Sequence, residues 1–82
     1  MFIVYVLYSE KFDKIYIGFT ADIGKRFLFH NEIAKKGWTT RFRPWTIFYL
    51  EEFVSKALAM RREKELKSAR GREFIWKMIR RK

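Results

Sequence analysis

Apolar residues near the start of the chain fall into two runs separated by a polar segment. Residues 2–8 form a continuous run of β-branched and aromatic side chains, which is typical of a central, buried strand. Residues 15–19 form a shorter run of the same kind, and the polar residues 9–14 between them include Asp13. This pattern predicts a hairpin of two antiparallel strands joined by a polar loop.

A helical pattern follows the hairpin. Thr20 or Asp22 is suited to cap a helix that runs to about Lys36, and Gly37 is suited to end it. The segment is therefore predicted to be one helix with an apolar face. The helical repeat places on that face Ile23, Phe27, His30 and Ala34.

The remainder of the chain predicts a loop, a strand and two helices. Residues 37–44 are basic and predict a loop, and residues 45–53 alternate loosely, as a third strand would. Ser55 is suited to cap a helix over residues 56–68, and Gly71 is expected to break the helical pattern. A last helix should follow, with an apolar face made by Phe74, Ile75, Met78 and Ile79.

These elements, in the order β-β-α-β-α-α, predict an α+β fold. The sheet should be small, three-stranded and mainly antiparallel, and helices should flank it, because the chain cannot build a second sheet. A length of 82 residues predicts a single domain over residues 1–82. Nearly half of the residues are hydrophobic, 49%, and 20% are aromatic, so a core of large side chains is available.

Several classes of site are excluded by composition. The chain has no Cys, which excludes disulfides and zinc–thiolate sites, and its single histidine, His30, excludes a multi-histidine metal site. The apolar run at the N-terminus is too short to span a bilayer, and no basic leader precedes it. A cytoplasmic location is therefore expected.

The net charge adds an expectation about the partner. Nineteen Lys and Arg against nine Asp and Glu give a formal charge of +10. An excess of this size on a small surface favours a polyanion, of which a phosphate backbone is the commonest. Anionic lipid is the rival partner, and simple solubilisation is the alternative without a partner.

Two tyrosines of the predicted hairpin are candidates for chemistry. If Leu7 pairs with Tyr16, then Tyr5 lies opposite Gly18 and both phenols project from one face of the sheet. Gly18 would leave open space beside Tyr5 where a substrate backbone can approach. The alternative is that both tyrosines are core residues, because strands favour Tyr.

Charged side chains on the predicted helices are further candidates. Arg26 and His30 are four residues apart and share one side of their helix, although a packed His and a solvated Arg would have the same spacing. Glu63 lies at the edge of an apolar helix face, where a half-buried carboxylate needs a cation. That cation is Arg62, Lys67 or a metal ion such as Mg²⁺, which often takes only one or two protein carboxylates.

The predicted loop combines arginines with aromatic residues. Arg41 and Arg43 alternate with Trp38, Phe42 and Trp45. Arginines pair with phosphates and aromatic rings stack on bases, so the segment suits nucleic acid. Equally, the aromatic side chains would anchor an ordinary loop to the core.

Taken together, these residues resemble the GIY-YIG nuclease family. The first motif is Val4-Tyr5-Val6, which keeps the central tyrosine, and the second, Tyr16-Ile17-Gly18, is intact. Arg26 follows Tyr16 by ten residues and His30 follows Arg26 by four, as in the helix motif Arg-x-x-x-His of the family. Residues 59–67 resemble its metal-binding helix. The likeness is closest to the small stand-alone bacterial members.

The resemblance implies a metal-dependent endonuclease that hydrolyses phosphodiester bonds. Glu63 would hold one Mg²⁺ or Mn²⁺ ion, and Gly18 would serve as a structural motif residue. The substrate would be DNA rather than RNA, with no membrane and no obligate protein partner. The expected catalytic residues are Tyr5, Tyr16, Arg26 and His30. The residues expected to contact nucleic acid are Lys25, Arg41, Arg43 and Arg62.

Two other functions fit the same pattern. A basic nucleic-acid-binding module with weak or lost catalysis would use the basic C-terminal region and the Arg/aromatic segment. A membrane-surface or protein-interaction domain would use the basic C-terminal helix. The assignment of the general base also stays open among Tyr16, Tyr5 and His30.

Overall fold

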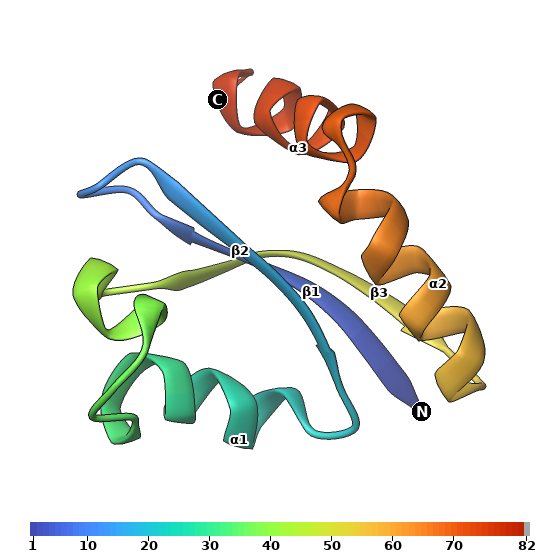
Figure 1. The fold of residues 1–82 in the computed structure, drawn as a ribbon, viewed down its shortest axis with the longest axis horizontal. Helices are drawn as coiled ribbons and strands as arrows, with labels where there is room; N and C mark the ends of the chain where they lie inside the picture. The colour runs from blue at the N-terminus through green and yellow to red at the C-terminus, as the bar shows by residue number, and fades with distance from the viewer. Residues whose placement is uncertain (82) are drawn as a thin grey trace.

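The computed structural model describes residues 1–81, and its elements follow the predicted order (Figure 1). A π-helical turn and a 3₁₀ helix, η1 and η2, lie between the first helix and the third strand. The strands are β1 (Phe2–Ser9), β2 (Lys14–Thr20) and β3 (Thr46–Phe53), and the helical segments are α1 (Ile23–Leu28), η1 (Phe29–Ile33), η2 (Trp38–Phe42), α2 (Lys56–Lys67) and α3 (Ala69–Arg80).

The three strands form one antiparallel sheet in the order β2-β1-β3. The predicted α+β class, the sheet and the central position of the first strand are all confirmed. The hairpin register assumed from the sequence is the one observed, since Leu7 pairs with Tyr16 and Tyr5 pairs with Gly18. Both strands beside β1 are therefore edge strands, and Tyr16 lies on one of them.

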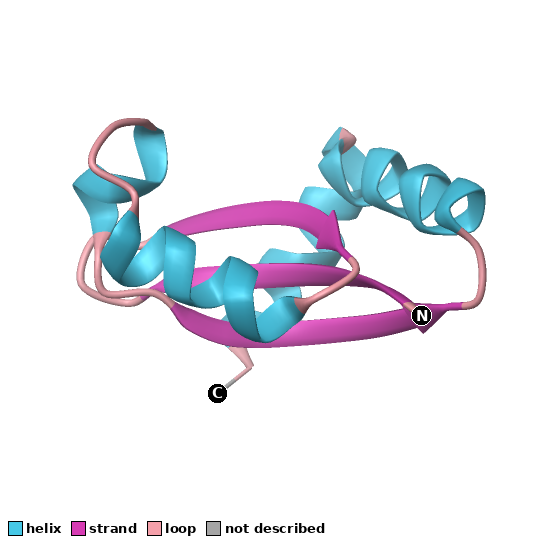
Figure 2. Cartoon of the chain, turned by 90° about the horizontal axis from the view of Figure 1, so that it is seen from below, coloured by secondary structure: helices cyan, strands magenta, loops and turns pink. Residues whose placement is uncertain are grey.

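Helical segments cover both faces of the sheet (Figure 2). On one face, Val4, Val6 and Ile17 of the hairpin pack against α2 and α3, including Leu66 and Ile75. On the other face, the buried side chains are Tyr5, Leu7 and Trp45, with partly buried Tyr16, Ile23, Phe27 and Phe42 around them. Alternate residues of β1 thus enter two separate cores, and the two tyrosines of interest belong to the second.

The first helix is shorter than predicted. Asp22, not Thr20, caps α1, because its carboxylate accepts a hydrogen bond from the Lys25 amide at 3.1 Å. The α-helix ends at Leu28, a π-turn follows, and Ala34 is extended, so the prediction of a helix to about Lys36 was wrong. The structure has a physical reason for the early end: the carbonyls of the last turn accept hydrogen bonds from a distant arginine, as described below.

Two glycines also have roles other than those predicted. Gly37 has a φ of 107° and precedes η2, so it starts a 3₁₀ helix within the predicted loop rather than ending α1. Gly71 does not break a helix, because it lies inside α3, and the break falls at Ser68. A Cβ at Gly71 would lie 2.2 Å from the Glu65 carbonyl oxygen, so glycine is needed where α3 crosses the end of α2.

Candidate active site

Tyr5 is a buried residue whose phenol has a hydrogen-bonding partner. Only 1% of its surface is exposed, and its hydroxyl lies 3.1 Å from Nε2 of His30. Its ring lies directly over Gly18, where an added Cβ would be 2.6 Å from the Tyr5 hydroxyl. The expectation of open space beside Tyr5 was therefore wrong, because the tyrosine ring itself fills the space that glycine leaves.

His30 lies between two hydroxyl groups. Its Nε2 faces Tyr5 and its Nδ1 lies 3.1 Å from Oγ1 of Thr39, which is also buried. Burial lowers the pKa of His30, and the nearby charges of Arg26 and Arg43 lower it further. The ring is therefore neutral at pH 7, with one nitrogen donating and the other accepting.

The pKa of Tyr5 shows which groups surround it. Burial raises this pKa to about 12. The Arg26 guanidinium opposes the rise through a hydrogen bond and its charge, whereas Tyr16 and the Glu63 carboxylate add to it. Tyr5 is accordingly a neutral phenol at physiological pH, and residues from β2, α1 and α2 act on its hydroxyl.

Tyr16 is the more accessible phenol of the pair. Its ring centroid lies 6.3 Å from that of Tyr5 and 4.7 Å from that of His30. It is partly exposed and borders a surface depression of about 370 Å³. The depression is lined by Ile15, Tyr16, Ile17, Trp38, Lys67 and Arg72. A substrate can thus reach Tyr16 directly, whereas it reaches Tyr5 only through neighbouring side chains.

Arg26 lies in the last turn of α1 and is exposed. Its guanidinium stacks over the ring of Phe29, 5.1 Å from the centroid, and it borders a shallow pocket together with Lys25. A guanidinium held by an aromatic ring keeps its N–H groups available to oxyanions. Arg26 and Lys25 therefore form a cationic rim next to the buried Tyr5–His30 pair.

Glu63 is partly buried on α2, with 21% of its side chain exposed. Its carboxylate lies 3.4 Å from Nζ of Lys67, one turn further along the helix. In residues 1–81, no group of three or more His, Asp or Glu side chains is arranged to hold a metal ion. One partly exposed carboxylate, whose partner Lys67 borders the depression at Tyr16, still fits Mg²⁺, which commonly keeps most of its ligands as water and substrate oxygens.

Arg43, expected to contact nucleic acid, makes hydrogen bonds inside the protein. Its Nε donates to the His30 carbonyl at 2.7 Å and its Nη2 donates to the Ala34 carbonyl at 2.6 Å. Nη2 also donates to the carbonyl of Phe29 at 3.4 Å. These carbonyls lie in η1 and at its C-cap, so Arg43 supplies hydrogen-bond donors where the first helix stops. Arg41, two residues earlier, is exposed on η2.

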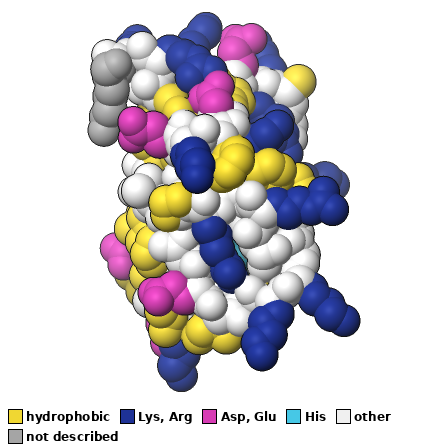
Figure 3. Space-filling model, turned by 90° about the vertical axis from the view of Figure 1, so that its left-hand side faces the viewer, with side chains coloured by type: hydrophobic (Ala, Val, Ile, Leu, Met, Phe, Trp, Pro, Cys, Tyr) yellow, Lys and Arg dark blue, Asp and Glu magenta, His cyan; other side chains and the backbone are white. Residues whose placement is uncertain are grey.

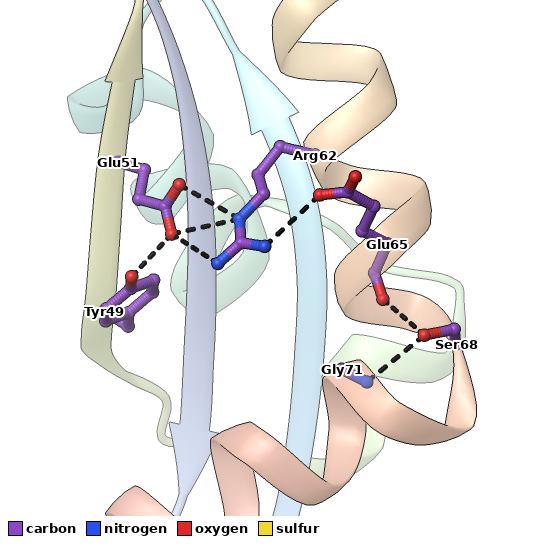
Figure 4. A network of polar contacts seen from close by, with 6 residues as sticks. All are labelled: Tyr49, Glu51, Arg62, Glu65, Ser68 and Gly71. Carbon is purple, nitrogen blue, oxygen red and sulfur yellow. Dashed lines mark hydrogen bonds and ion pairs between the residues drawn. The ribbon is translucent and has the colours of Figure 1, made fainter.

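Arg62, the other predicted nucleic-acid contact on α2, points toward β3 (Figure 4). Its guanidinium donates to both carboxylate oxygens of Glu51, at 3.0 to 3.1 Å, and to Glu65 at 3.2 Å. Tyr49 donates a further hydrogen bond to Glu51. The network joins α2 to β3, the edge strand opposite β2, whereas the neighbouring Glu63 pairs with Lys67 on α2 itself.

Two residues of the site carried no recognisable signal in the sequence. Thr39 contacts His30 across nine positions, and its carbonyl accepts a hydrogen bond from Nε1 of Trp45 at 2.8 Å. The amide of Asn31 bonds to both the backbone N–H and the carbonyl of Trp45, fourteen positions away. Side-chain pairs of this kind join η1 to the segment before β3, and no local spacing predicts them.

The fold and these clustered side chains are those of a small catalytic domain, and comparison with known proteins gives its family. The model of the GIY-YIG catalytic domain matches residues 1–78. The UPF0213 protein SH2523 of Staphylococcus haemolyticus is 38% identical over 69 residues, which cover 84% of this chain and 83% of that protein. No solved structure matches the chain significantly. The chain therefore belongs to the GIY-YIG family of nuclease-type catalytic domains.

Proposed function

We propose that this protein is a metal-dependent endonuclease that hydrolyses phosphodiester bonds in DNA. One observation carries the proposal: the hydroxyl of Tyr5 is influenced at once by His30, Arg26, Tyr16 and Glu63. Membership of the GIY-YIG family supports nuclease-type chemistry for these residues. Their grouping around one buried phenol supports a shared site rather than four unrelated roles.

The accessible side chains suggest a division of labour. Arg26 would neutralise charge on the non-bridging phosphate oxygens as it builds up. Tyr16, the phenol open to solvent, would orient or deprotonate the attacking water. Tyr5, with its pKa raised to about 12, would stay protonated and hold His30 through its hydroxyl. Tyr5 is thus the weakest of the three candidates for general base.

Glu63 is the residue that would hold one Mg²⁺ or Mn²⁺ ion. Such an ion supplies charge neutralisation at the departing oxygen of the scissile phosphate. Because Lys67 lies 3.4 Å from the same carboxylate, the lysine would have to move aside or turn toward a phosphate. Affinity for metal in the absence of nucleic acid should consequently be weak.

The test is cleavage of single-stranded, duplex and branched DNA in Mg²⁺ or Mn²⁺ by wild-type protein and two matched variants. Glu63→Gln should abolish cleavage, with a loss of at least about 100-fold. Glu65 lies on the same helix, and its carboxylate pairs with Arg62. The Glu65→Gln variant should therefore cut DNA like the wild type. Equal cutting by wild type and Glu63→Gln would mean that the activity is a contaminant and that the proposal is wrong.

A nucleic-acid-binding module without catalysis is the second candidate. The observation in its favour is the Lys67–Glu63 ion pair, which already neutralises the one carboxylate of the site. This candidate predicts salt-sensitive binding that survives both Glu63→Gln and Arg26→Ala, with no cleavage in either metal. Cleavage that Glu63→Gln abolishes would reject it.

The remaining expectations belong to the same proposal. No helix within residues 1–81 is both long enough and apolar enough to cross a membrane. Basic side chains lie among hydrophobic, acidic and other groups on the end of the molecule that carries the β1–β2 turn and η2 (Figure 3). We propose that a single nuclease domain acts there on DNA rather than RNA, in the cytoplasm, with no membrane and no obligate protein partner. Arg41 and Lys25 are the exposed residues proposed to contact the backbone.

A further inference from the structure

We infer that Phe12, Trp38 and Phe42 form a stacking surface for the bases of an unpaired nucleic-acid strand beside the candidate active site. Phe12 comes from the β1–β2 turn and the other two residues come from η2. The inference rests on the proposed function, because it names the form of substrate that this same site would take. It assigns a binding role to rings that the catalytic proposal leaves unused.

The three rings form a continuous series that leads to Tyr16. Phe12 and Phe42 have centroids 5.5 Å apart, and Phe42 and Trp38 have centroids 4.7 Å apart. Trp38 in turn lies 6.5 Å from Tyr16, with an angle of 31° between the ring planes. Trp38 and Tyr16 also line the same depression. A strand whose phosphate reaches Tyr16 would therefore bring the adjoining bases over Trp38.

Two of the three rings, those of Phe12 and Trp38, are more exposed than a role in anchoring the segment requires, whereas Phe42 is partly buried. Trp45 does that anchoring, since it is 1% exposed and is held by hydrogen bonds to Asn31 and Thr39. Trp38 is 45% exposed and Phe12 is 40% exposed. Because Phe42 joins these two exposed rings, they form one aromatic patch beside the candidate site, and such a patch is better explained by a ligand than a single exposed ring would be.

Lysine and arginine side chains lie beside these rings. The Nζ of Lys11 lies 5.4 Å from the centroid of Phe12, and that of Lys14 lies 5.6 Å from the centroid of Phe42. Arg72 and Lys67 border the depression at the Tyr16 end. Proteins that bind single strands stack the bases on aromatic rings and pair the phosphates with lysine and arginine side chains. In a duplex, the faces of the bases are already stacked on neighbouring base pairs, so exposed aromatic rings favour the bases of an unpaired strand.

Binding assays without metal ion test the inference, in the Glu63→Gln background so that nothing is cut. The Glu63→Gln protein without a further substitution should bind a single-stranded oligothymidylate more tightly than a duplex of equal length. Trp38→Ala should weaken single-strand binding by about 10-fold and duplex binding much less. Phe74→Ala is the matched control, because Phe74 is 42% exposed but lies on α3, where it contacts Tyr49 and Arg62, and it should change neither.

Two additions keep the result decisive if Trp38→Ala folds poorly. Phe12→Ala, at the exposed turn, should weaken single-strand binding in the same direction. An abasic strand of the same length keeps the phosphates but lacks the bases. The Glu63→Gln protein should bind this strand at least about 5-fold more weakly than the oligothymidylate. Equal affinity for the abasic and thymidylate strands would overturn the stacking surface. That outcome would leave cleavage by the proposed nuclease intact, so the two proposals fail separately.

Discussion

The hydroxyl of Tyr5 lies 3.1 Å from Nε2 of His30, although the two residues are 25 positions apart. Tyr5 belongs to the central strand and His30 to the π-turn that follows α1, so the contact ties the helical layer to the sheet. Both groups are buried, with 1% and 3% of their surfaces exposed. Burial raises the pKa of Tyr5 and lowers that of His30, which keeps both neutral over the physiological range.

Thr39 should control the hydrogen bonding of this pair. Its Oγ1 contacts Nδ1 of His30, so Thr39→Val removes that partner and leaves a buried ring nitrogen unsatisfied, whereas Thr39→Ser keeps it. We expect Thr39→Val to lose about 1–3 kcal/mol of unfolding free energy and Thr39→Ser to lose less. Urea unfolding gives the stability, and the ¹⁵N shifts of the imidazole report the tautomer. An unchanged imidazole spectrum in Thr39→Val would refute the role.

Gly18→Ala should destabilise the protein. The new methyl would lie 2.6 Å from the Tyr5 hydroxyl and 2.8 Å from Cζ, and a buried ring on a central strand has little room to move. Overpacking of this kind costs about 1–3 kcal/mol. Gly24→Ala is the control, because its nearest neighbour is 3.6 Å away and alanine favours the helix, so thermal unfolding should show no loss of stability. Equal melting temperatures for the two variants would contradict the packing argument.

Substitutions of Arg43 and Arg41 should have different effects, the first on stability and the second on DNA binding. Arg43→Ala removes donors from the carbonyls of Phe29, His30 and Ala34, and we expect a loss of about 2 kcal/mol or more in denaturant unfolding. Arg41→Ala should leave stability within about 0.5 kcal/mol and weaken DNA binding at low salt. The opposite pattern, a stable Arg43→Ala and a destabilised Arg41→Ala, would show that the end of η1 is held in some other way.

Glu51 should make stability depend on pH. Burial tends to raise its pKa, but hydrogen bonds from Arg62 and Tyr49 outweigh burial and hold the pKa below its ordinary value of 4.5. A depressed pKa means that the folded state binds the proton less readily than the unfolded state. The stabilisation is therefore present above about pH 4.5 and is lost as the pH falls through the folded-state pKa.

Glu51→Gln measures this contribution. It should be less stable than wild type by about 1–3 kcal/mol at pH 7, with a smaller difference at pH 3, as followed by urea unfolding. Glu73→Gln is the control, because its ion pair with Lys77 is exposed, at 71% and 72%, and should contribute little. A difference for Glu51→Gln that is the same at both pH values would exclude ionisation of Glu51 as the cause.

The pattern of the sequence was sufficient for the order of elements and for a hairpin of the first two strands. The pairs Leu7–Tyr16 and Tyr5–Gly18 were one register that the sequence allowed, and the tertiary structure selected it over a one-residue slip that would have separated the two tyrosines. The helical position of Arg26 could also be predicted from local preferences, whereas the π-turn that holds His30 could not.

The partners of each charged or polar side chain depended on contacts between distant segments. Arg43 reaches carbonyls nine to fourteen residues away and helps to end the helix where propensity would have continued it. Arg62 is directed to Glu51 on β3, whereas its neighbour Glu63 contacts Lys67 and acts on Tyr5. Local spacing states which residues share a face, but packing of the two helical layers on the sheet selects which groups meet, because each buried polar group must find a partner.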